Sequence, residues 1–93
     1  MGEYSIVLER IAEKQIKLHF KSGDKASIKR INQIFEELKS TPYSGIGSPE
    51  ALIYSLSKFW SRKINQKDRM IYKVEEDIVT VFIISAMGHN SDK

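Results

Sequence analysis

The sequence predicts an α+β fold in which a helical hairpin packs on a mainly antiparallel sheet, with elements in the order β-α-α-β-β-β-β. Three observations predict it. A short alternating segment comes first, two segments with a helical period follow, and the second half holds short strand-like segments separated by turns. A chain of 93 residues normally builds one hydrophobic core, so we expect a single domain over residues 1–93.

The first half of the chain carries the signals of one strand and two helices. Residues 3–8 alternate enough to form a strand, a helix is expected from Glu9 to about Phe20, and a second helix over residues 25–39. Between the helices, Gly23 suits a left-handed helix end and Asp24 an N-cap. The expected core positions are Ala12, Ile16 and Phe20 in the first helix and Ile28, Ile31, Phe35 and Leu38 in the second.

The second half begins with an irregular loop and continues as strands. Residues 42–49 contain both prolines of the chain and two of its glycines, which indicates a loop. Consecutive short strands with short connections favour an antiparallel sheet that has the helices on one face. The strands are expected at about 50–56, 59–65, 68–75 and 77–86, with turns near Leu56-Ser57 and Asn65-Gln66.

The composition excludes several classes of protein. With 41% hydrophobic and 29% charged residues, it is typical of a globular domain. The longest apolar run, residues 79–87, is far shorter than the roughly 20 residues of a membrane helix. The chain has no cysteine and no secretory pattern, so we expect a cytoplasmic protein without membrane contact. With only two histidines and no ligand cluster at metal spacing, we expect no metal and no cofactor.

Positive charge is concentrated between residues 58 and 73. Six cations face one acidic residue there, a local charge of +5, whereas the whole chain carries +3. The cations are Lys58, Arg62, Lys63, Lys67, Arg69 and Lys73. Such a cluster is typical of a surface that binds a polyanion, and equally of a solvated face that keeps a protein soluble. Charge alone leaves both interpretations open.

One carboxylate, one arginine and one histidine can meet on one face of this sheet. Glu50 opens a strand, Arg69 lies beside a turn, and His89 follows the last strand. Cleavage of RNA by its own 2′-hydroxyl needs a base, a cation for the phosphorane charge and an acid, and these residues can fill the three roles. Each also has a plain structural interpretation, as a strand-end carboxylate, a surface ion pair or an exposed histidine near a chain end.

The segment from Thr41 to Val74 resembles the Txe/YoeB toxins of the RelE superfamily. It reads TPYSGIGSPEAL and then LSKFWSRKINQKDRMIYKV. The family pattern is a TP-F/Y-x-G-x-G-x-P-E loop, then L-x-G-x-W/F-S-R-R-I-x-x-x-H-R-L-V-Y, and a C-terminal G/Y-H-Y. The resemblance covers nearly the whole chain, including DKASIKRINQIFEEL as the second helix, and it implies a RelE-like fold.

The resemblance implies the toxin of a type II toxin-antitoxin system, a ribosome-dependent mRNA endoribonuclease. Such a toxin cuts the codon in the A site and leaves a 2′,3′-cyclic phosphate. Carried over position by position, Glu50 is the general base, Arg69 the cation that stabilises the transition state, and His89 the general acid. The RNA-binding residues that we expect are Arg62, Lys63, Lys58 and Asn90.

The resemblance also implies the partners. A cognate YefM-like antitoxin is expected to cover or distort the site, and toxins of this group often occur as homodimers. The ribosome and its mRNA are the expected targets. DNA is expected to be contacted only indirectly, through the antitoxin.

Three positions depart from the family pattern. Lys63 stands in place of an arginine, which keeps the charge but loses the bidentate geometry for phosphate. Asp68 stands in place of a histidine and puts a carboxylate beside Arg69. Asn90 stands in place of a tyrosine, whose aromatic area asparagine does not replace. An alternative function is therefore an attenuated toxin that acts mainly as the antitoxin-bound partner in autorepression, or a plain RNA-binding module.

Overall fold

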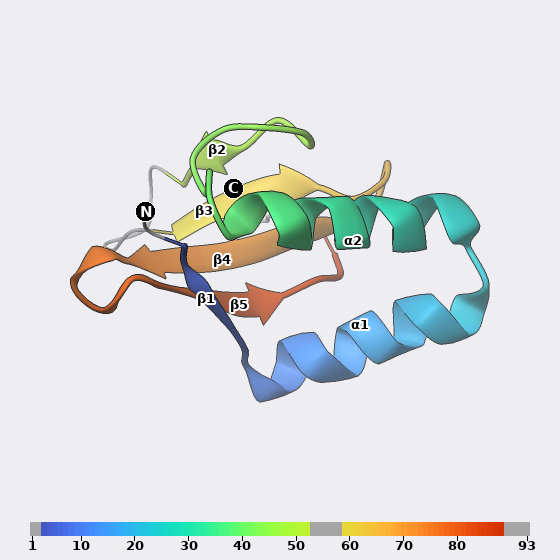
Figure 1. Cartoon of the computed structure of the whole chain (residues 1–93). Coiled ribbons are helices and arrows are strands. Elements are labelled where there is room, and N and C mark those ends of the chain that lie inside the picture. The colour runs from blue at the N-terminus through green and yellow to red at the C-terminus, as the bar shows by residue number, and fades with distance from the viewer. Residues whose placement is uncertain (1–2, 53–58, 89–93) are drawn as a thin grey trace.

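The structure is a computed structural model that describes residues 3–52 and 59–88 (Figure 1). The order β-α-α-β-β-β-β is confirmed. The turn expected near Leu56-Ser57 and most of the strand expected at 50–56 lie outside the described residues. The elements are β1 (Ser5–Leu8), α1 (Arg10–Ser22), α2 (Lys25–Leu38), β2 (Glu50–Ala51), β3 (Phe59–Lys63), β4 (Arg69–Glu75), a 3-10 turn (Glu76–Ile78) and β5 (Thr80–Ser85).

The described strands form one mixed sheet in the order β1-β5-β4-β3-β2. Three of its strand pairs are antiparallel, as predicted, and only β1 runs parallel to its neighbour β5. A parallel pair needs a long crossover connection, and here the two helices and the rest of the sheet lie between β1 and β5 in the sequence. The central strand is β4, which places its first residues between β3 and the end of β5 (Figure 1).

Local signals set the ends of the helices as predicted. Gly23 ends α1 with φ +77°, a conformation that glycine adopts without strain. Asp24 caps α2, because its carboxylate accepts from the N–H of Ser27 at 3.3 Å and from the Ser27 hydroxyl at 2.8 Å. These hydrogen bonds lower the pKa of Asp24. Neither described helix is long and apolar enough to cross a membrane.

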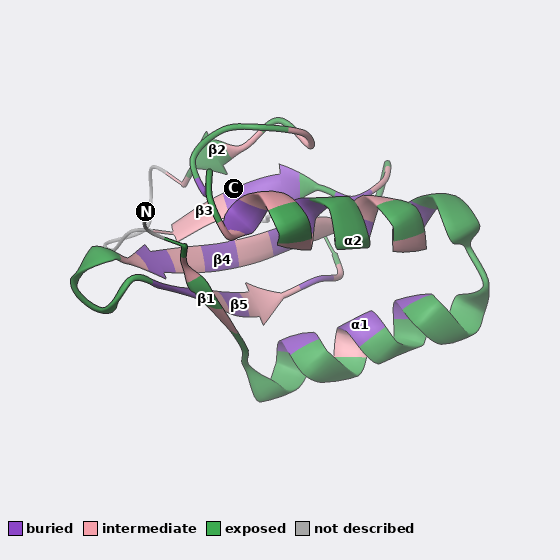
Figure 2. Ribbon diagram, in the orientation of Figure 1, coloured by how far each residue is buried: buried purple, intermediate pink, exposed green. Residues whose placement is uncertain are grey.

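The core lies between the two helices and one face of the sheet (Figure 2). Burial of each large apolar side chain contributes about 1.5–3 kcal/mol to folding, so this layer supplies most of the stabilisation. Its buried residues in the helices are Ala12, Ile16, Ile31, Ile34 and Leu38, and in the last two strands Met70, Tyr72, Val74, Val81 and Ile83.

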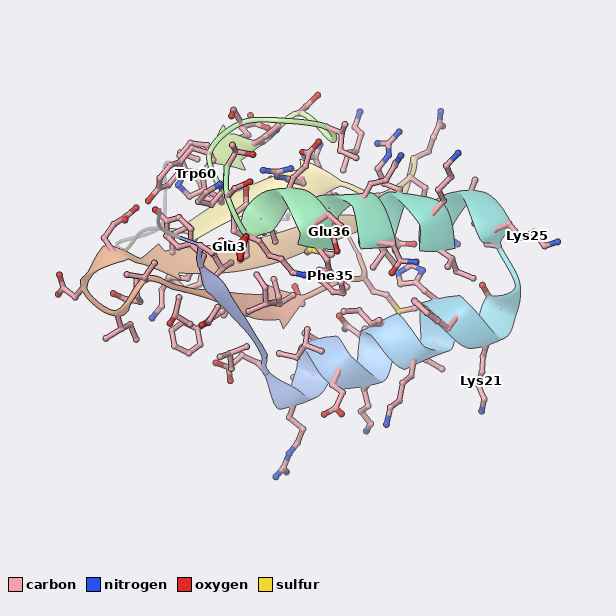
Figure 3. All side chains as sticks on the ribbon, in the orientation of Figure 1. Glu3, Lys21, Lys25, Phe35, Glu36 and Trp60 are labelled. Carbon is pink, nitrogen blue, oxygen red and sulfur yellow. The ribbon has the colours of Figure 1, made fainter. Side chains whose placement is uncertain are left out.

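One expected core position is wrong, and two others are only partly buried. Phe20 is 46% exposed, whereas His19 is buried at 4%. Seven residues make almost two helical turns, so His19 lies in line with Ala12, but position 20 has rotated by about 80°. On α2, Ile34 is fully buried, and the expected core residues Ile28 and Phe35 are only partly buried, Phe35 against the core (Figure 3).

Candidate active site

Strand pairing places three of the predicted site residues on the same face of the sheet. Glu50 pairs with Ser61, and Lys63, two residues further along β3, pairs with Arg69. Because side chains alternate along a strand and paired residues share a face, Glu50, Lys63 and Arg69 point the same way. Arg62, between Ser61 and Lys63, points to the opposite face, toward the helices. We call the face that carries Glu50, Lys63 and Arg69 the open face.

Glu50 and Arg69 reach toward each other on the open face. The Oε1 atom of Glu50 lies 3.9 Å from Nη1 of Arg69. The Glu50 side chain is 66% exposed and that of Arg69 28% exposed. An exposed pair at this distance adds little to stability. Both groups therefore keep most of their hydrogen-bonding capacity for a ligand, one as a proton acceptor and the other as a donor to an anion.

The loop before Glu50 is built around the buried guanidinium of Arg62. This side chain has no exposed surface, and all five of its N–H donors have acceptors within the protein. Nη1 donates to Glu37 Oε1 (2.7 Å) and to the carbonyl of Ile46 (3.3 Å), Nη2 to the carbonyls of Thr41 (2.9 Å) and Ser44 (2.8 Å), and Nε to the hydroxyl of Tyr72 (3.1 Å).

The position of Arg62 contradicts the expectation that it binds RNA phosphate. A guanidinium whose donors are all used inside the protein has none left for a ligand. Its role here is to donate to loop carbonyls that have no strand partner. The sequence signal that could have revealed this role is the loop itself. Prolines and glycines exclude a regular ladder, so its carbonyls need side-chain donors.

Tyr72 and two glycines complete the packing of this loop. The Tyr72 hydroxyl donates to the Pro42 carbonyl at 2.7 Å, and burial raises the pKa of Tyr72 against the opposing effect of Arg62. A Cβ at Gly45 would overlap the Glu37 carboxylate, and one at Gly47 would lie 2.9 Å from the carbonyl oxygen of residue 63. Both glycines have positive φ. The loop therefore has a defined conformation, and it fixes where Glu50 enters β2.

The C-terminal end of the described chain returns to Arg69. The Arg69 N–H donates to the carbonyl of Gly88 at 3.0 Å, and the Asp68 carboxylate accepts from the Gly88 N–H at 2.9 Å. Asp68 was expected to put its charge beside Arg69. Instead its carboxylate is bonded to Gly88 and Asn65, and the ion pair of Arg69 is with Glu50. Sequence patterns gave no sign of the Gly88 contact, which joins residues twenty positions apart.

Three of the predicted site residues, Lys58, His89 and Asn90, lie outside the described residues. Lys63 is exposed at the end of β3, opposite Arg69. Within residues 3–52 and 59–88, no three histidine, cysteine or acidic side chains lie close enough to hold a metal ion. The structure thus brings together Glu50, Lys63 and Arg69, and it separates Arg62 from them.

The sequence of this chain is similar to that of a described protein family and of named relatives. The family model described as "YoeB-like toxin of bacterial type II toxin-antitoxin system" matches residues 14–89. Toxin YoeB of Escherichia coli O6:H1 is 39% identical over 64 residues, which cover 69% of this chain and 76% of that protein. The match includes most of the chain, and with it the loop and the strands that carry the site.

Solved structures agree with the sequence match. A YoeB/ParE toxin from Agrobacterium tumefaciens has a TM-score of 0.81 at 25% identity, covering 91% of this chain and 98% of its own. The YoeB dimer of Staphylococcus aureus has a TM-score of 0.78 at 29% identity, covering 95% and 99%. The heterotetrameric YoeB-YefM complex of that organism gives 0.75 at the same identity and coverage. This chain therefore belongs to the YoeB-like toxins of bacterial type II toxin-antitoxin systems.

Proposed function

We propose that this chain is a ribosome-dependent, metal-independent endoribonuclease that cuts mRNA in the A site. The observation that carries the proposal is the Glu50 and Arg69 pair, a carboxylate and a guanidinium 3.9 Å apart on the open face of the sheet. Proton acceptor and cation are close enough to act on one phosphodiester. Distances between catalytic groups are often long without substrate and shorten when it binds.

In the proposed reaction the RNA supplies its own nucleophile. Glu50 takes the proton of the 2′-hydroxyl, and the 2′-oxygen attacks the neighbouring phosphorus. Arg69 stabilises the negative charge that builds up on the phosphorane oxygens. The bond from phosphorus to the 5′-oxygen then breaks, and His89 gives a proton to that oxygen. The products are a 2′,3′-cyclic phosphate and a 5′-hydroxyl.

The open face supports a dependence on the ribosome. Glu50 is two-thirds exposed and Lys63 is exposed, so the described part of the site is a surface rather than an enclosed pocket. Such a surface orients a flexible RNA poorly, and correct orientation is worth orders of magnitude in rate. A codon held in the A site arrives already oriented. This target places the toxin in the cytoplasm.

The partners that we propose follow from the relatives. YoeB of Staphylococcus aureus has been solved as a dimer and as a heterotetrameric complex with YefM. We infer that this chain binds a cognate YefM-like antitoxin, forms a homodimer, and reaches DNA only through that antitoxin. Size determination of the co-expressed pair, with and without the antitoxin, tests the assembly.

Primer extension on ribosomes programmed with an mRNA tests the reaction. The wild-type chain should produce A-site cuts, and Glu50→Gln should abolish them while keeping the shape of the side chain. Glu36→Gln is the matched control, because Glu36 is an exposed carboxylate on α2, far from the open face (Figure 3). Cuts that persist in Glu50→Gln would remove Glu50 as the base. No cuts by the wild-type chain would contradict the function.

A second candidate function rests on Asn90, which stands where the family pattern has tyrosine. An attenuated toxin would still bind its antitoxin and take part in autorepression. The variant Asn90→Tyr distinguishes the two. Cleavage by Asn90→Tyr alone would identify an attenuated toxin, and equal cleavage by both chains would discard that alternative.

A further inference from the structure

Both backbone polar groups of Gly88 are bonded to the start of β4. Its N–H donates to Asp68 Oδ1 at 2.9 Å, and its carbonyl accepts from the Arg69 N–H at 3.0 Å. Gly88 has φ +85°, a conformation that glycine adopts without strain. The backbone is therefore fixed beside Arg69 one residue before His89.

The Asp68 carboxylate is itself held by hydrogen bonds that lead back to α2. Its Oδ2 accepts from Asn65 Nδ2 at 3.3 Å, and the same Nδ2 donates to Ser27 Oγ at 2.7 Å. The Ser27 hydroxyl in turn donates to Asp24, the N-cap of α2. Asp68 is only 9% exposed, and charged acceptors withdrawn from water make strong hydrogen bonds. The carboxylate that receives the Gly88 N–H thus has a defined position.

Helix α1 fixes the same segment from the other side. The Ala86 N–H donates to Gln15 Oε1 at 2.7 Å, and His19 Nε2 donates to the Ala86 carbonyl at 2.8 Å. Ala86 is fully buried and His19 nearly so. The backbone between Ala86 and Gly88 is therefore held at both ends. At the Gly88 end, Asp68 is the side chain that holds it.

We propose that Asp68 is a positioning residue, whose carboxylate holds Gly88 and thereby constrains the backbone that leads into His89. The inference rests on the proposed function, in which His89 is the general acid. Asp68 itself does not touch the RNA. The departure from the family pattern at position 68 then supplies an acceptor for the Gly88 N–H instead of weakening the field of Arg69.

The short connection gives this anchor its effect. Consecutive Cα atoms are about 3.8 Å apart, so the position of Gly88 limits where the next residue can lie. Without Asp68, the hydrogen bond that Gly88 keeps to the described residues is the one to the Arg69 N–H, and the segment can rotate about it. A displacement of a catalytic group by about 1 Å can lower a rate about 100-fold.

The test compares Asp68→Ala and Asp68→Asn with the wild-type chain. Asp68→Ala should lower kcat for ribosomal cleavage by up to about 100-fold with little change in KM, because Asp68 does not contact substrate. Asp68→Asn keeps an oxygen that can accept from Gly88 and should restore most of the rate. The matched control is Asp77→Ala, which removes the same charge from an exposed turn.

Amide hydrogen exchange, measured by NMR, reports directly on the hydrogen bond from the Gly88 N–H to Asp68. In Asp68→Ala the Gly88 amide should exchange at least about tenfold faster, while the Val74 amide in the core of β4 keeps its protection. Loss of protection at Val74 would indicate a fold that is disturbed as a whole. Asp68→Ser, which keeps a polar group too short to reach Gly88, would then replace the alanine variant.

The outcomes separate this proposal from the function. Unchanged Gly88 exchange in Asp68→Ala, or unchanged kcat, overturns the role of Asp68 while wild-type cleavage still supports the nuclease. A raised KM with normal kcat would make Asp68 a binding residue and also overturn the proposal. A wild-type chain that does not cleave overturns the function, and the role in catalysis with it; the Gly88 exchange rate still decides whether Asp68 holds the segment.

Discussion

Two arginines on adjacent strands of the sheet have opposite environments. Arg62 on β3 is fully buried, and all five of its donors are used by acceptors within the protein. The Arg69 side chain on β4 is 28% exposed, and its ion pair with Glu50 is long, at 3.9 Å. Arg69 pairs with Lys63, the residue after Arg62, so strand alternation sends the two guanidinium groups to opposite faces.

The difference shows that the face of the sheet, and not the residue type, decides what each arginine does. Toward the helices, a guanidinium is enclosed and becomes the centre of a loop. On the open face, the same group keeps its donors for an anion. Substitutions at the two positions should therefore separate stability from activity.

The largest expected effect is on stability at Arg62. Arg62→Met should lower the free energy of unfolding by about 3–5 kcal/mol, because it removes the cationic partner of Glu37 and the guanidinium donor of several loop carbonyls. Arg69→Met should cost less than about 1 kcal/mol. Urea denaturation of both variants measures the contrast.

Arg62→Lys sharpens the same contrast. Lysine keeps the charge opposite Glu37 but has only three donors for five acceptors. We therefore expect a free energy of unfolding between those of the wild-type and Arg62→Met chains. Equal losses at positions 62 and 69 would contradict the assignment of a structural role to Arg62.

The next effect is on activity at Arg69. Arg69→Met should lower ribosomal cleavage by about 10²–10³-fold, equivalent to about 2.7–4 kcal/mol of transition-state stabilisation. The fold should survive, as its thermal unfolding would show. Lys14→Met, which removes a charge from the exposed side of α1, should cleave normally. Cleavage by Arg69→Met at the wild-type rate would exclude Arg69 from the reaction.

A smaller effect is expected at the tyrosine that supports Arg62. Tyr72→Phe removes the acceptor of Arg62 Nε and the donor to the Pro42 carbonyl. Leaving buried polar groups unpaired costs about 1–3 kcal/mol. Tyr4→Phe is a suitable control, because the Tyr4 hydroxyl is bonded to Glu76 at an exposed site. Equal losses of unfolding free energy in Tyr72→Phe and Tyr4→Phe would mean that the burial of the hydrogen bonds around Arg62 adds nothing to stability.

The smallest effect is a loss of stability at alkaline pH. Burial raises the pKa of Tyr72, whereas an unfolded chain releases the tyrosine proton near about pH 10. Above that pH the unfolded state loses the proton and the folded state keeps it, so the free energy of unfolding falls, by at most about 1.4 kcal/mol per pH unit for one group. Below it, this contribution is fully present.

Urea midpoints measured between about pH 9 and about pH 11 test this dependence. The decline should be shallower for Tyr72→Phe than for the wild-type chain. Part of it should persist, because burial and the hydrogen bond to Glu76 raise the pKa of Tyr43 as well. Identical declines in the two chains would show that Tyr72 does not contribute.

Local signals predicted the fold well, and long-range contacts explain what they missed. Asp24 and Gly23 mark the turn between the helices because capping depends on neighbouring residues. The shared face of Glu50 and Arg69 follows from strand order and period. The burial of Arg62 was not predictable from spacing, since its carboxylate partner Glu37 lies twenty-five positions earlier, on a helix. The hydrogen bond between Gly88 and Asp68 was not predictable either, because these residues are twenty positions apart in the sequence.

The strand order also determines at which point of its synthesis the chain can form the proposed active site. Because β1 pairs with β5, the first strand that is synthesised cannot pair until the last strand has been synthesised. Contacts between distant parts of a chain form late in folding. A nascent chain that ends before Thr80 lacks both the partner of β1 and the segment that returns to Arg69. Synthesis must therefore be nearly complete before the active site of the proposed nuclease can fold.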